Sequence, residues 1–558
     1  MSVGVLQQPW SEKISLAVWI QRTSRGALVS GIFLLVLYPL LMVIAAAVAP
    51  AFPDAQPLTL TDLLSERLIT AAVNTLRLGI WVSLLSLIAG AALALLATQS
   101  RRGRWIDLLM SLPFLTPPFL ASLAWSLAVG RRGYLGRFAQ AESLGRFSER
   151  FIFSFWGLSL VMAVHYAPIV YFAVRAQIEK IPSSLLWAGQ IAGAARLQII
   201  GRILLPMIFP ALLAGGFLAF ACGIEEYGTP LVIGNRIGFP VIATEIGRIV
   251  RVYPINLTLA SALASLLFAL VGAVYVLSYF LQRDAKATAK VSGHAAPHLL
   301  SPMTSAGLWL FAALYFLFTL VIPYGSMLIT SLLKLVSAGP TLDNLTLAHY
   351  FQALTDESSG LRQALTASFS LALMAALLGT FVGAACARTG GALTSIALIP
   401  AATPAITMAV GFIRGWNAPW TAWLPLYGSA LIVGFFYTAQ YLPYAVQYAR
   451  AGLATIPPSY EWAARIHGSG RGLITRRIVA PLLWPHCLAG AILIFSISFR
   501  ELVGSVLLRP PGMQTVATFI LREFDQGSPA TGMAMGVIAI SVSMLSISLA
   551  RWLVPKRF

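Results

Sequence analysis

Long runs of apolar residues alternate with short polar segments along this sequence. Several runs reach roughly 20 residues, the length at which an α-helix crosses the hydrocarbon core of a bilayer. The pattern therefore predicts an all-α polytopic membrane protein with about 12 transmembrane helices. We expect these helices at about 27–50, 71–98, 106–128, 152–174, 206–223, 257–281, 307–333, 364–387, 392–413, 427–449, 483–499 and 530–553.

One polar, glycine-punctuated segment between the apolar runs occurs twice. Its first copy begins at Ile181 and ends at Gly215, and its second begins at Ile456 and ends at Gly490. The matches share one offset of 275 positions without a gap, a register that chance similarity between apolar segments would not keep. The chain is therefore predicted to be an internal duplication. Because an even number of expected spans separates the copies, both should face the same side of the membrane, as in two parallel six-helix repeats.

The duplication divides the chain into two halves and a linker. The first half is expected at 1–281 and the second at 303–558. The stretch 282–302 contains basic residues, two histidines, glycine and proline without apolar periodicity. We therefore interpret it as a cytoplasmic linker.

Composition supports the membrane assignment and restricts the function. Hydrophobic residues make up 58% of the chain and charged residues only 10%, whereas soluble domains contain about 25% charged residues. The net charge of +19 comes from Lys and Arg scattered in short clusters between the apolar runs. This distribution fits the positive-inside rule better than a nucleic-acid-binding face, and it places both termini in the cytoplasm.

No motif in the sequence indicates catalysis. There is no Gly-Lys-Ser/Thr phosphate loop and no His-Glu-x-x-His zinc motif, and the six histidines form no cluster with metal-ligand spacing. The three cysteines, Cys222, Cys386 and Cys487, lie inside or beside apolar runs and are interpreted as free core thiols. We therefore expect no enzyme activity, no metal site and no cofactor in this chain.

The loop 130–150 departs from the charge pattern. It carries five arginines against two glutamates, although alternation of the spans places it on the outer face. Either the loop solvates its own charges while stronger flanking clusters set the topology, or it meets an acidic partner or an anionic ligand outside.

Each copy of the repeated segment is predicted to form an elbow of two short helices. The run around Trp187, or Trp462 in the second copy, can form the first helix, which Gly193 or Gly468 can end. A second short helix with basic residues then leads to a proline at the membrane entrance. One such copy would be compatible with an ordinary basic loop, but two copies on one face suit docking to a twofold partner.

These elbows resemble the cytoplasmic coupling loop, or EAA motif, of binding-protein-dependent ABC importer permeases of the type I fold. In that motif a glycine is followed after nine residues by Ile-x-Leu-Pro, and Gly193 and Gly468 have this spacing to an isoleucine. The sequence departs from the motif where Trp187 and Trp462 occupy the glutamate position, with Glu461 one place early. The resemblance implies coupling loops at 181–206 and 456–481 that use Trp187, Ala188, Gly189, Gly193, Ile203, Pro206, Glu461, Trp462, Ala463, Ala464, Gly468, Ile478 and Pro481.

The resemblance covers nearly the whole chain as two fused permease halves. Among fused permeases it is nearest to the ferric-iron importers, through Pro113-x-x-Thr-Pro-Pro in the first half and Arg500-Glu501-Leu502 in the second. It implies a bacterial inner-membrane permease, with ferric iron as the first expected solute. Thiamine, aminoethylphosphonate and polyamine permeases share much of the pattern, so these solutes stay open. An ATP-independent secondary transporter is the alternative from another class.

The resemblance also implies the partners. These are two copies of a cytoplasmic ATP-binding subunit, a periplasmic substrate-binding protein and the lipid bilayer, with no nucleic acid. ATP and Mg would be used by the partner subunit, whose closure the two loops would transmit to the two halves.

Two matched pairs of residues are candidates for the translocation pathway. Tyr166 and Glu226 match Tyr441 and Glu501 at the offset of 275. Ionisable groups at membrane depth are costly and tend to face a polar interior, although carboxylates at span ends and tyrosines between packed helices are also common. Further ionisable candidates near the spans are Arg77, His165, Glu225 and Arg500.

Overall fold

The computed structural model describes residues 26–48, 59–130, 133–138, 140–283, 299–355 and 360–553. Within these ranges the regular structure is helical, apart from one isolated bridge between Leu333 and Leu345. The two termini, expected in the cytoplasm, and most of the linker 282–302 lie outside the described residues.

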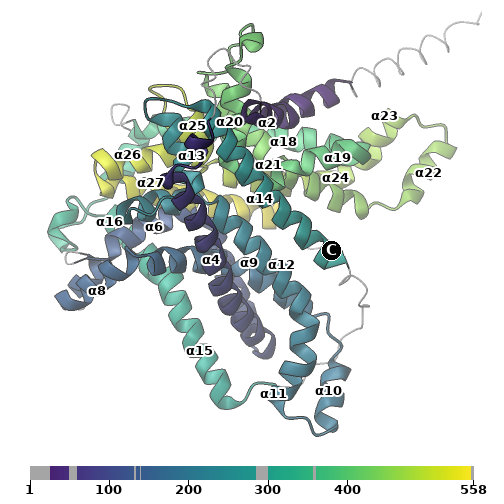
Figure 1. Cartoon of the computed structure of the whole chain (residues 1–558). Coiled ribbons are helices and arrows are strands. Elements are labelled where there is room, and N and C mark those ends of the chain that lie inside the picture. Colours follow the sequence, from purple (N-terminus) through teal and green to yellow (C-terminus); the bar gives the residue numbers. More distant parts are fainter. Residues whose placement is uncertain are drawn as a thin grey trace, which may run out of the picture.

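Three long helices form the centre of each half (Figure 1). In the first half they are α4 (Glu66–Gln99), α9 (Phe155–Ile178) and α12 (Leu205–Glu225). Their counterparts in the second half are α18 (Leu361–Thr389), α21 (Ala430–Ala454) and α24 (Ala480–Ser498). A further helix packs on each group, α14 (Leu257–Arg283) on α12 and α27 (Pro529–Leu553) on α24. The same arrangement thus recurs in both halves, as the duplication predicts.

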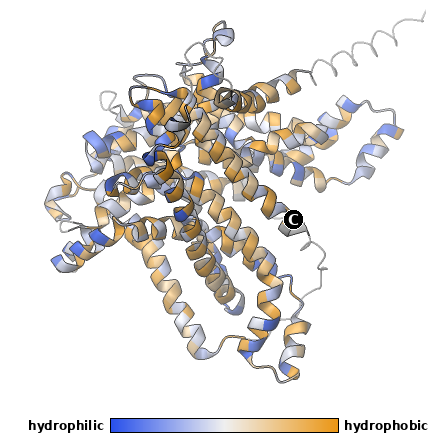
Figure 2. Cartoon of the chain, viewed as in Figure 1, coloured by the Kyte–Doolittle hydropathy of each residue, from blue (hydrophilic) through white to orange (hydrophobic). Residues whose placement is uncertain are grey.

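Nine helices in the described part of the chain are long and apolar enough to cross a membrane. Each overlaps a span expected from the sequence. They are Gly26–Ala47, Glu66–Gln99, Phe155–Ile178, Arg196–Glu225, Leu257–Phe280, Pro302–Ser331, Leu361–Thr389, Arg471–Ser498 and Pro529–Ala550. Figure 2 shows their apolar surfaces as orange ribbons, with polar residues gathered at their ends.

The remaining three expected spans differ from the prediction. The span expected at 427–449 is the continuous helix α21, which falls short of the apolar character of the other nine. The spans expected at 106–128 and 392–413 are each broken in the middle. In the second half Gly391–Ala402 meets Ala405–Trp416 at an angle of 112°, and in the first half α5 (Gly103–Ser111) is separated from α6 (Pro118–Ala128).

Prolines explain both breaks. Thr116 precedes Pro117 with φ −112°, and Thr403 precedes Pro404 with φ −110°, so both threonines are extended. A residue before proline is sterically driven out of the helical region, which ends the first segment there. The motif Pro-x-x-Thr-Pro, visible in both halves of the sequence, therefore marks a break where an uninterrupted span was expected.

The first span of each half packs against the other half. α2 (Tyr38–Val48) lies against α20 (Ala405–Trp416) of the second half, and α16 (Ile322–Ser331) lies against α6 of the first. Tyr38 donates a hydrogen bond to the carbonyl of Gly415 at 2.7 Å. A Cβ at Gly411 would lie 2.5 Å from the carbonyl oxygen of Pro39, so this crossing requires glycine. Because the first span of each half packs against the other half, the two halves share one hydrophobic core.

Short helices follow the central bundle in each half: α13 (Ile242–Arg251), α25 (Val503–Leu508) and α26 (Val516–Gln526). In Figure 1 they gather at the upper left, away from the first elbow at the bottom and from the second elbow at the right. α13 is fixed to α4 by Glu245, whose buried carboxylate pairs with Arg67 and Arg248 at 2.9 Å each. These short helices thus form a cap over one end of the bundle.

Candidate functional site

The two repeated segments have the same secondary structure, residue for residue. The first elbow consists of α10 (Ser183–Ile191), α11 (Arg196–Ile199) and the π-helical turn η3 (Ile200–Leu204). The second consists of α22 (Pro458–Ile466), α23 (Arg471–Ile474) and the π-helical turn η12 (Thr475–Val479). Every boundary keeps the offset of 275 found in the sequence. Both elbows lie at the ends of the long helices remote from α13, α25 and α26 (Figure 1).

The first helix of each elbow ends in the same turn, at the predicted glycine. Gly193 has φ +79° and Gly468 has φ +77°. After α10 the N–H of Gly193 bonds to the carbonyl of Gln190, and the N–H of Ala194 bonds to that of Gly189, at 2.9 and 3.0 Å. After α22 the corresponding bonds have the same lengths. This is the Schellman arrangement, in which a left-handed residue closes a helix and satisfies its last carbonyl groups.

The second short helix runs into the membrane span without a break. The helix from Arg196 continues to Glu225, and the helix from Arg471 continues to Ser498. Pro206 and Pro481 each follow a π-helical turn. Proline lacks the N–H that an α-helix needs and collides with the carbonyl four residues before it, so a wider turn accommodates it within a continuous helix. The second short helix of each elbow and a long helix of the central bundle therefore form one continuous element.

Each elbow exposes large apolar side chains at matched positions. Leu185, Trp187 and Ile191 have exposed fractions of 43%, 44% and 85%. Their counterparts Tyr460, Trp462 and Ile466 have exposed fractions of 52%, 64% and 84%. These six residues are called the elbow faces below. Exposed apolar clusters of this kind, repeated at equivalent positions, indicate an interaction site.

The small residues of the elbows have two different surroundings. A Cβ at Gly189 would lie 3.1 Å from Ile203 and 3.3 Å from Ile199, so its small size allows α10 to pack on the second short helix. Ala188 and Ala463 are exposed, and Ala464 is half-buried. Among the other predicted loop residues, Ile203 and Ile478 are half-buried, while Pro206 and Pro481 are exposed.

The inward side of the first elbow helix differs between the copies. Leu186 in α10 is buried at 3% exposure, whereas its counterpart Glu461 in α22 forms an ion pair with Arg388 at the end of α18. The guanidinium of Arg388 donates to both carboxylate oxygens at 2.5 and 3.1 Å, and Arg465 lies 3.5 Å away. The hydrogen bond from Arg388 lowers the pKa of Glu461. The glutamate that lies one place early in the motif thus binds within the chain.

A cavity of about 630 Å³ lies between the two halves. Its walls include both broken helices, through Thr116 and Thr403, and the ends of α12 and α24. Glu226, Tyr441 and Glu501 line it as well, which brings three of the four predicted pathway residues together. Tyr166 stands behind this wall and donates a hydrogen bond to Glu226 at 2.6 Å.

The matched carboxylates Glu226 and Glu501 both cap the chain after a span. Glu226 accepts the N–H groups of Gly228 and Thr229 at 3.0 and 3.1 Å. Glu501 accepts three N–H groups at the start of α25, from Val503, Gly504 and Ser505 at 2.8 to 3.2 Å. Carboxylates engaged in this way hold the turns that follow α12 and α24, which limits the oxygen lone pairs they can offer to a solute.

The neighbouring positions break the symmetry of the cavity. Glu225 lines it on one side, and Arg500 occupies the equivalent position on the other. His165 and Gln440 likewise occupy equivalent positions in the two halves, and both line the cavity. No hydrogen bond or ion pair engages Glu225 within the described part of the chain. The cavity therefore presents an acidic and a basic side chain at equivalent positions, which the predicted pairing of identical residues did not anticipate.

Two other predicted features have different surroundings. Arg77 is exposed and its guanidinium stacks over Phe155 at 4.2 Å, outside the cavity. In the basic loop, α7 (Tyr134–Phe138) and α8 (Glu142–Ile152) form short helices, and Arg137 donates to the carbonyl of Ser337 in the other half at 2.9 Å. Arg131 and Arg132 lie outside the described residues. Across the described ranges, no group of three or more His, Cys, Asp and Glu side chains could hold a metal ion.

Comparison with known proteins adds to this geometry. The family described as binding-protein-dependent transport system inner membrane component matches the chain twice, over residues 83–286 and 375–558. The ferric transport system permease protein FbpB of Actinobacillus pleuropneumoniae is 26% identical over 95% of this chain and 78% of that protein. The sulfate transport system permease protein CysT of Salmonella typhimurium is 29% identical over 37% of this chain and 74% of that protein. The putative 2-aminoethylphosphonate transport system permease protein PhnU of Salmonella choleraesuis is 30% identical over 31% of this chain and 61% of that protein. Each matched region contains one elbow.

Proposed function

The chain belongs to the family of binding-protein-dependent transport system inner membrane components, and we propose that it is a ferric-iron permease whose two elbows dock an ATP-hydrolysing partner. It is a multi-pass membrane protein of an ABC importer, with both permease halves in one chain.

The duplicated elbow is the observation that carries the docking role. Its two copies agree in every helix boundary and expose matching apolar side chains, the elbow faces. Two equivalent surfaces on one chain fit two copies of one partner, since each copy would meet the same face. An ATP-binding subunit suits this place because ABC importers are driven by ATP and the sequence of this chain holds no phosphate loop.

The coupling follows from the continuous helices. When the two partner subunits close on ATP, each would pull one elbow, and the second short helix of each elbow is the first part of a long helix that ends at the central cavity. Glu225 lies at that far end in one half, and Arg500 follows the span in the other. Closure on one face would thus move the charged lining of the cavity. A periplasmic binding protein would deliver the solute from the opposite side.

Ferric iron is the solute that the comparisons favour. The ferric permease of Actinobacillus pleuropneumoniae aligns with 95% of the chain, so it matches both fused halves, whereas the sulfate and 2-aminoethylphosphonate permeases match 37% and 31%. The carboxyl group of Glu225, which accepts no hydrogen bond from the described residues, offers a hard oxygen donor, and a transported ion needs only weak and transient contacts. Aminoethylphosphonate and sulfate are the second candidates because relatives with these named substrates align with part of the chain.

Reconstitution tests the assignment. The chain would be placed in proteoliposomes with its ATP-binding subunit and binding protein, and uptake of labelled ferric iron, aminoethylphosphonate, sulfate, thiamine and polyamine would be compared with and without ATP. We expect ATP-dependent uptake of ferric iron alone. ATP-dependent uptake of another solute would reject iron but retain the importer. Uptake by the lone chain without ATP would instead indicate a secondary transporter.

A further inference from the structure

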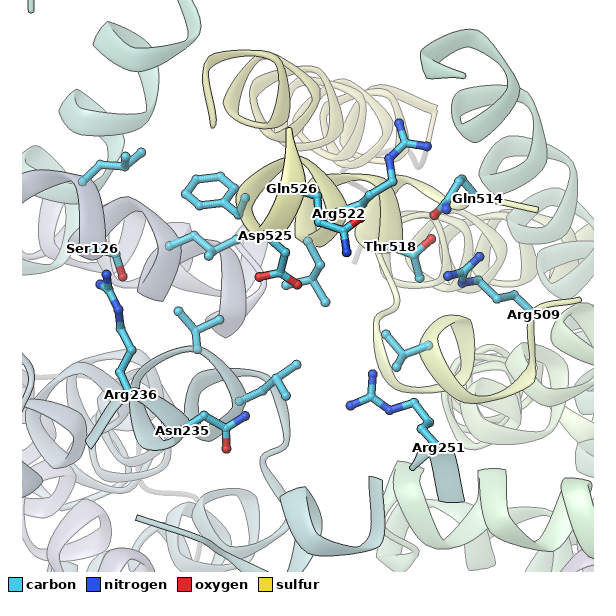
Figure 3. A pocket seen from close by; sticks show the side chains of 17 residues that line it. Ser126, Asn235, Arg236, Arg251, Arg509, Gln514, Thr518, Arg522, Asp525 and Gln526 are labelled. Carbon is cyan, nitrogen blue, oxygen red and sulfur yellow. The ribbon is translucent and has the colours of Figure 1, made fainter. Parts of the chain in front are cut away.

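A second cavity lies at the end of the molecule opposite the elbows. Its volume is about 1060 Å³, and it is walled by α6, the turns before α13, the end of α13, α25, α26 and the segment between α25 and α26. Both halves of the chain therefore contribute to it. Its charged lining consists of four arginines and one carboxylate, namely Arg236, Arg251, Arg509, Arg522 and Asp525 (Figure 3).

Two of these arginines, one from each half, extend toward the middle of the cavity. Figure 3 shows Arg251 and Arg509 reaching into the space that Asn235, Thr518 and Asp525 also border. A backbone carbonyl orients each guanidinium: Arg251 donates through Nε to Gly247 at 3.0 Å, and Arg509 donates through Nη1 to Met513. Both guanidinium groups border the cavity (Figure 3). A guanidinium fixed in this way can bind a planar or tetrahedral anion through two parallel hydrogen bonds.

The positive charge of the cavity is only partly compensated. Arg522 pairs with Glu523 at 2.9 Å, but no ion pair joins Asp525 to an arginine among the described residues. Burial, together with the positive charges of Arg522 and Arg251, lowers the pKa of Arg509. The arginines thus repel one another across a shared space, and an anion between them would remove that repulsion.

This second cavity, called the outer cavity below, lies next to the cavity between the two halves, which is the central cavity. On α25, Val503 lines the central cavity, and Val506, one helical turn further, lines the outer cavity. On α6, Phe119 lines the central cavity, and Leu123, one helical turn further, lines the outer cavity. One turn of each of two helices therefore separates the two spaces, and a solute arriving from the side opposite the elbows would meet the arginines first.

We propose that this cavity is an anion-binding vestibule, in which Arg251 and Arg509 hold an oxyanion or carboxylate group before the solute enters the central cavity. The inference rests on the proposed function and narrows it, because it requires that the solute carry negative charge when it is released to the permease. A bare ferric ion would be repelled by the arginines. The iron would therefore arrive as an anionic chelate, for which a space of about 1060 Å³ gives room.

Equilibrium binding on the full chain in lipid nanodiscs tests the vestibule. Labelled sulfate, phosphate and citrate would be titrated at constant ionic strength set with chloride. We expect saturable binding of at least one of them. The double variant R251Q/R509Q should weaken it by at least about tenfold, because it removes two charged hydrogen-bond donors from the anion. The control variant R146Q removes the same charge from exposed α8 outside the cavity and should bind as the wild type does.

The conservative variant R509K controls for a folding defect, because it keeps the positive charge but loses the forked guanidinium. Its affinity for the anion should lie between that of the wild type and that of the double variant. Absence of saturable binding by the wild type, or equal binding by R251Q/R509Q, would overturn the proposal. So would a double variant that loses only its affinity for the liganded binding protein, because the cavity would then be a docking surface. The titration needs no ATP-binding subunit, so failure of the proposed transport function would appear only in the uptake assay.

Discussion

Gly193 and Gly468 are the residues on which the shape of the elbows depends most directly. Both adopt a left-handed conformation, and in both cases an added Cβ would have no heavy atom within 4 Å. The requirement for glycine is thus conformational rather than steric. It was visible in the sequence because the residue that follows a short apolar helix and precedes another helix is commonly glycine.

Two substitutions at Gly468 therefore test whether the left-handed conformation of this residue is needed for coupling. Valine in a left-handed conformation costs at least about 1–2 kcal/mol, whereas asparagine tolerates that conformation. We expect G468V to lower ATP-driven uptake severalfold in proteoliposomes and G468N to retain most of it, with equal insertion of both proteins. Equal activity of the two variants would show that the turn plays no part in coupling.

Glu225 and Glu226 are adjacent acidic residues with different surroundings. Glu226 accepts hydrogen bonds from Tyr166 and two backbone N–H groups, while Glu225 lines the cavity and accepts none among the described residues. The duplication in the sequence pointed to Glu226 and Glu501, because identical residues recur there. Glu225 was only one of several ionisable candidates near the spans, because its partner position holds Arg500 and a difference between repeats gives no signal in a search for identity.

These different surroundings predict different outcomes for the neutral variants E226Q and E225Q. E226Q removes one oxygen acceptor from a partly buried network, which costs about 1–3 kcal/mol, so its melting temperature should fall. E225Q should retain the melting temperature of the wild type and change the rate of ATP-driven uptake. Thermal unfolding in detergent and uptake in proteoliposomes measure the two effects. A larger loss of stability in E225Q than in E226Q would contradict the assignment.

At the scale of elements, the two elbows are equal in outline and different in attachment. α10 is held by the buried Leu186, and α22 by the ion pair of Glu461 with Arg388. The sequence showed this inequality as Leu186 against Glu461, but not the partner, because Arg388 lies 73 residues before Glu461 and comes close only in the fold.

The attachment of α22 should therefore depend on pH, and that of α10 should not. Because the pKa of Glu461 is lowered in the folded protein, its contribution is complete above the ordinary value of 4.5 and is lost as the pH falls through the folded pKa. Hydrogen-exchange protection, corrected for the intrinsic rate at each pH, should fall in α22 between pH 7 and pH 3 and stay constant in α10.

The variant E461Q supplies the control for this pH effect. It should reduce protection of α22 at pH 7 by up to about fivefold, the worth of a partly exposed ion pair, and abolish the pH dependence. Protection of α22 that remains unchanged in E461Q would show that the ion pair does not hold the helix.

The broken helices show what apolar patterning leaves undetermined. Hydropathy runs through 106–128 and 392–413 without interruption, so a continuous span was expected at each. Prolines are tolerated within membrane helices, as Pro168 in α9 and Pro443 in α21 show. Whether a proline bends, widens or breaks a helix depends on the partners available to its freed carbonyl groups, which only the packed structure supplies.

At the scale of the whole molecule, the sequence was sufficient for the duplication, the elbows and nine of the spans that the structure describes. The exchange of α2 and α16 between the halves was not predictable, because hydropathy does not say which apolar surface meets which. The outer cavity was missed for a related reason. Its arginines come from four separate segments, and the sequence drew attention to the basic loop 130–150 instead.

The central claim is that the two elbow faces each dock one ATP-binding subunit. Ile191 and Ile466 are the most exposed apolar side chains of these faces, at 85% and 84%. The most direct measurement is the amount of ATP-binding subunit that copurifies with I191E, I466E and the double variant in detergent. L342E, at a residue that is 89% exposed but outside the elbows, serves as the control. If each elbow face docks one subunit, we expect two copies on wild type and L342E, about one on each single variant and none on the double variant. Two copies retained by I191E/I466E would contradict it.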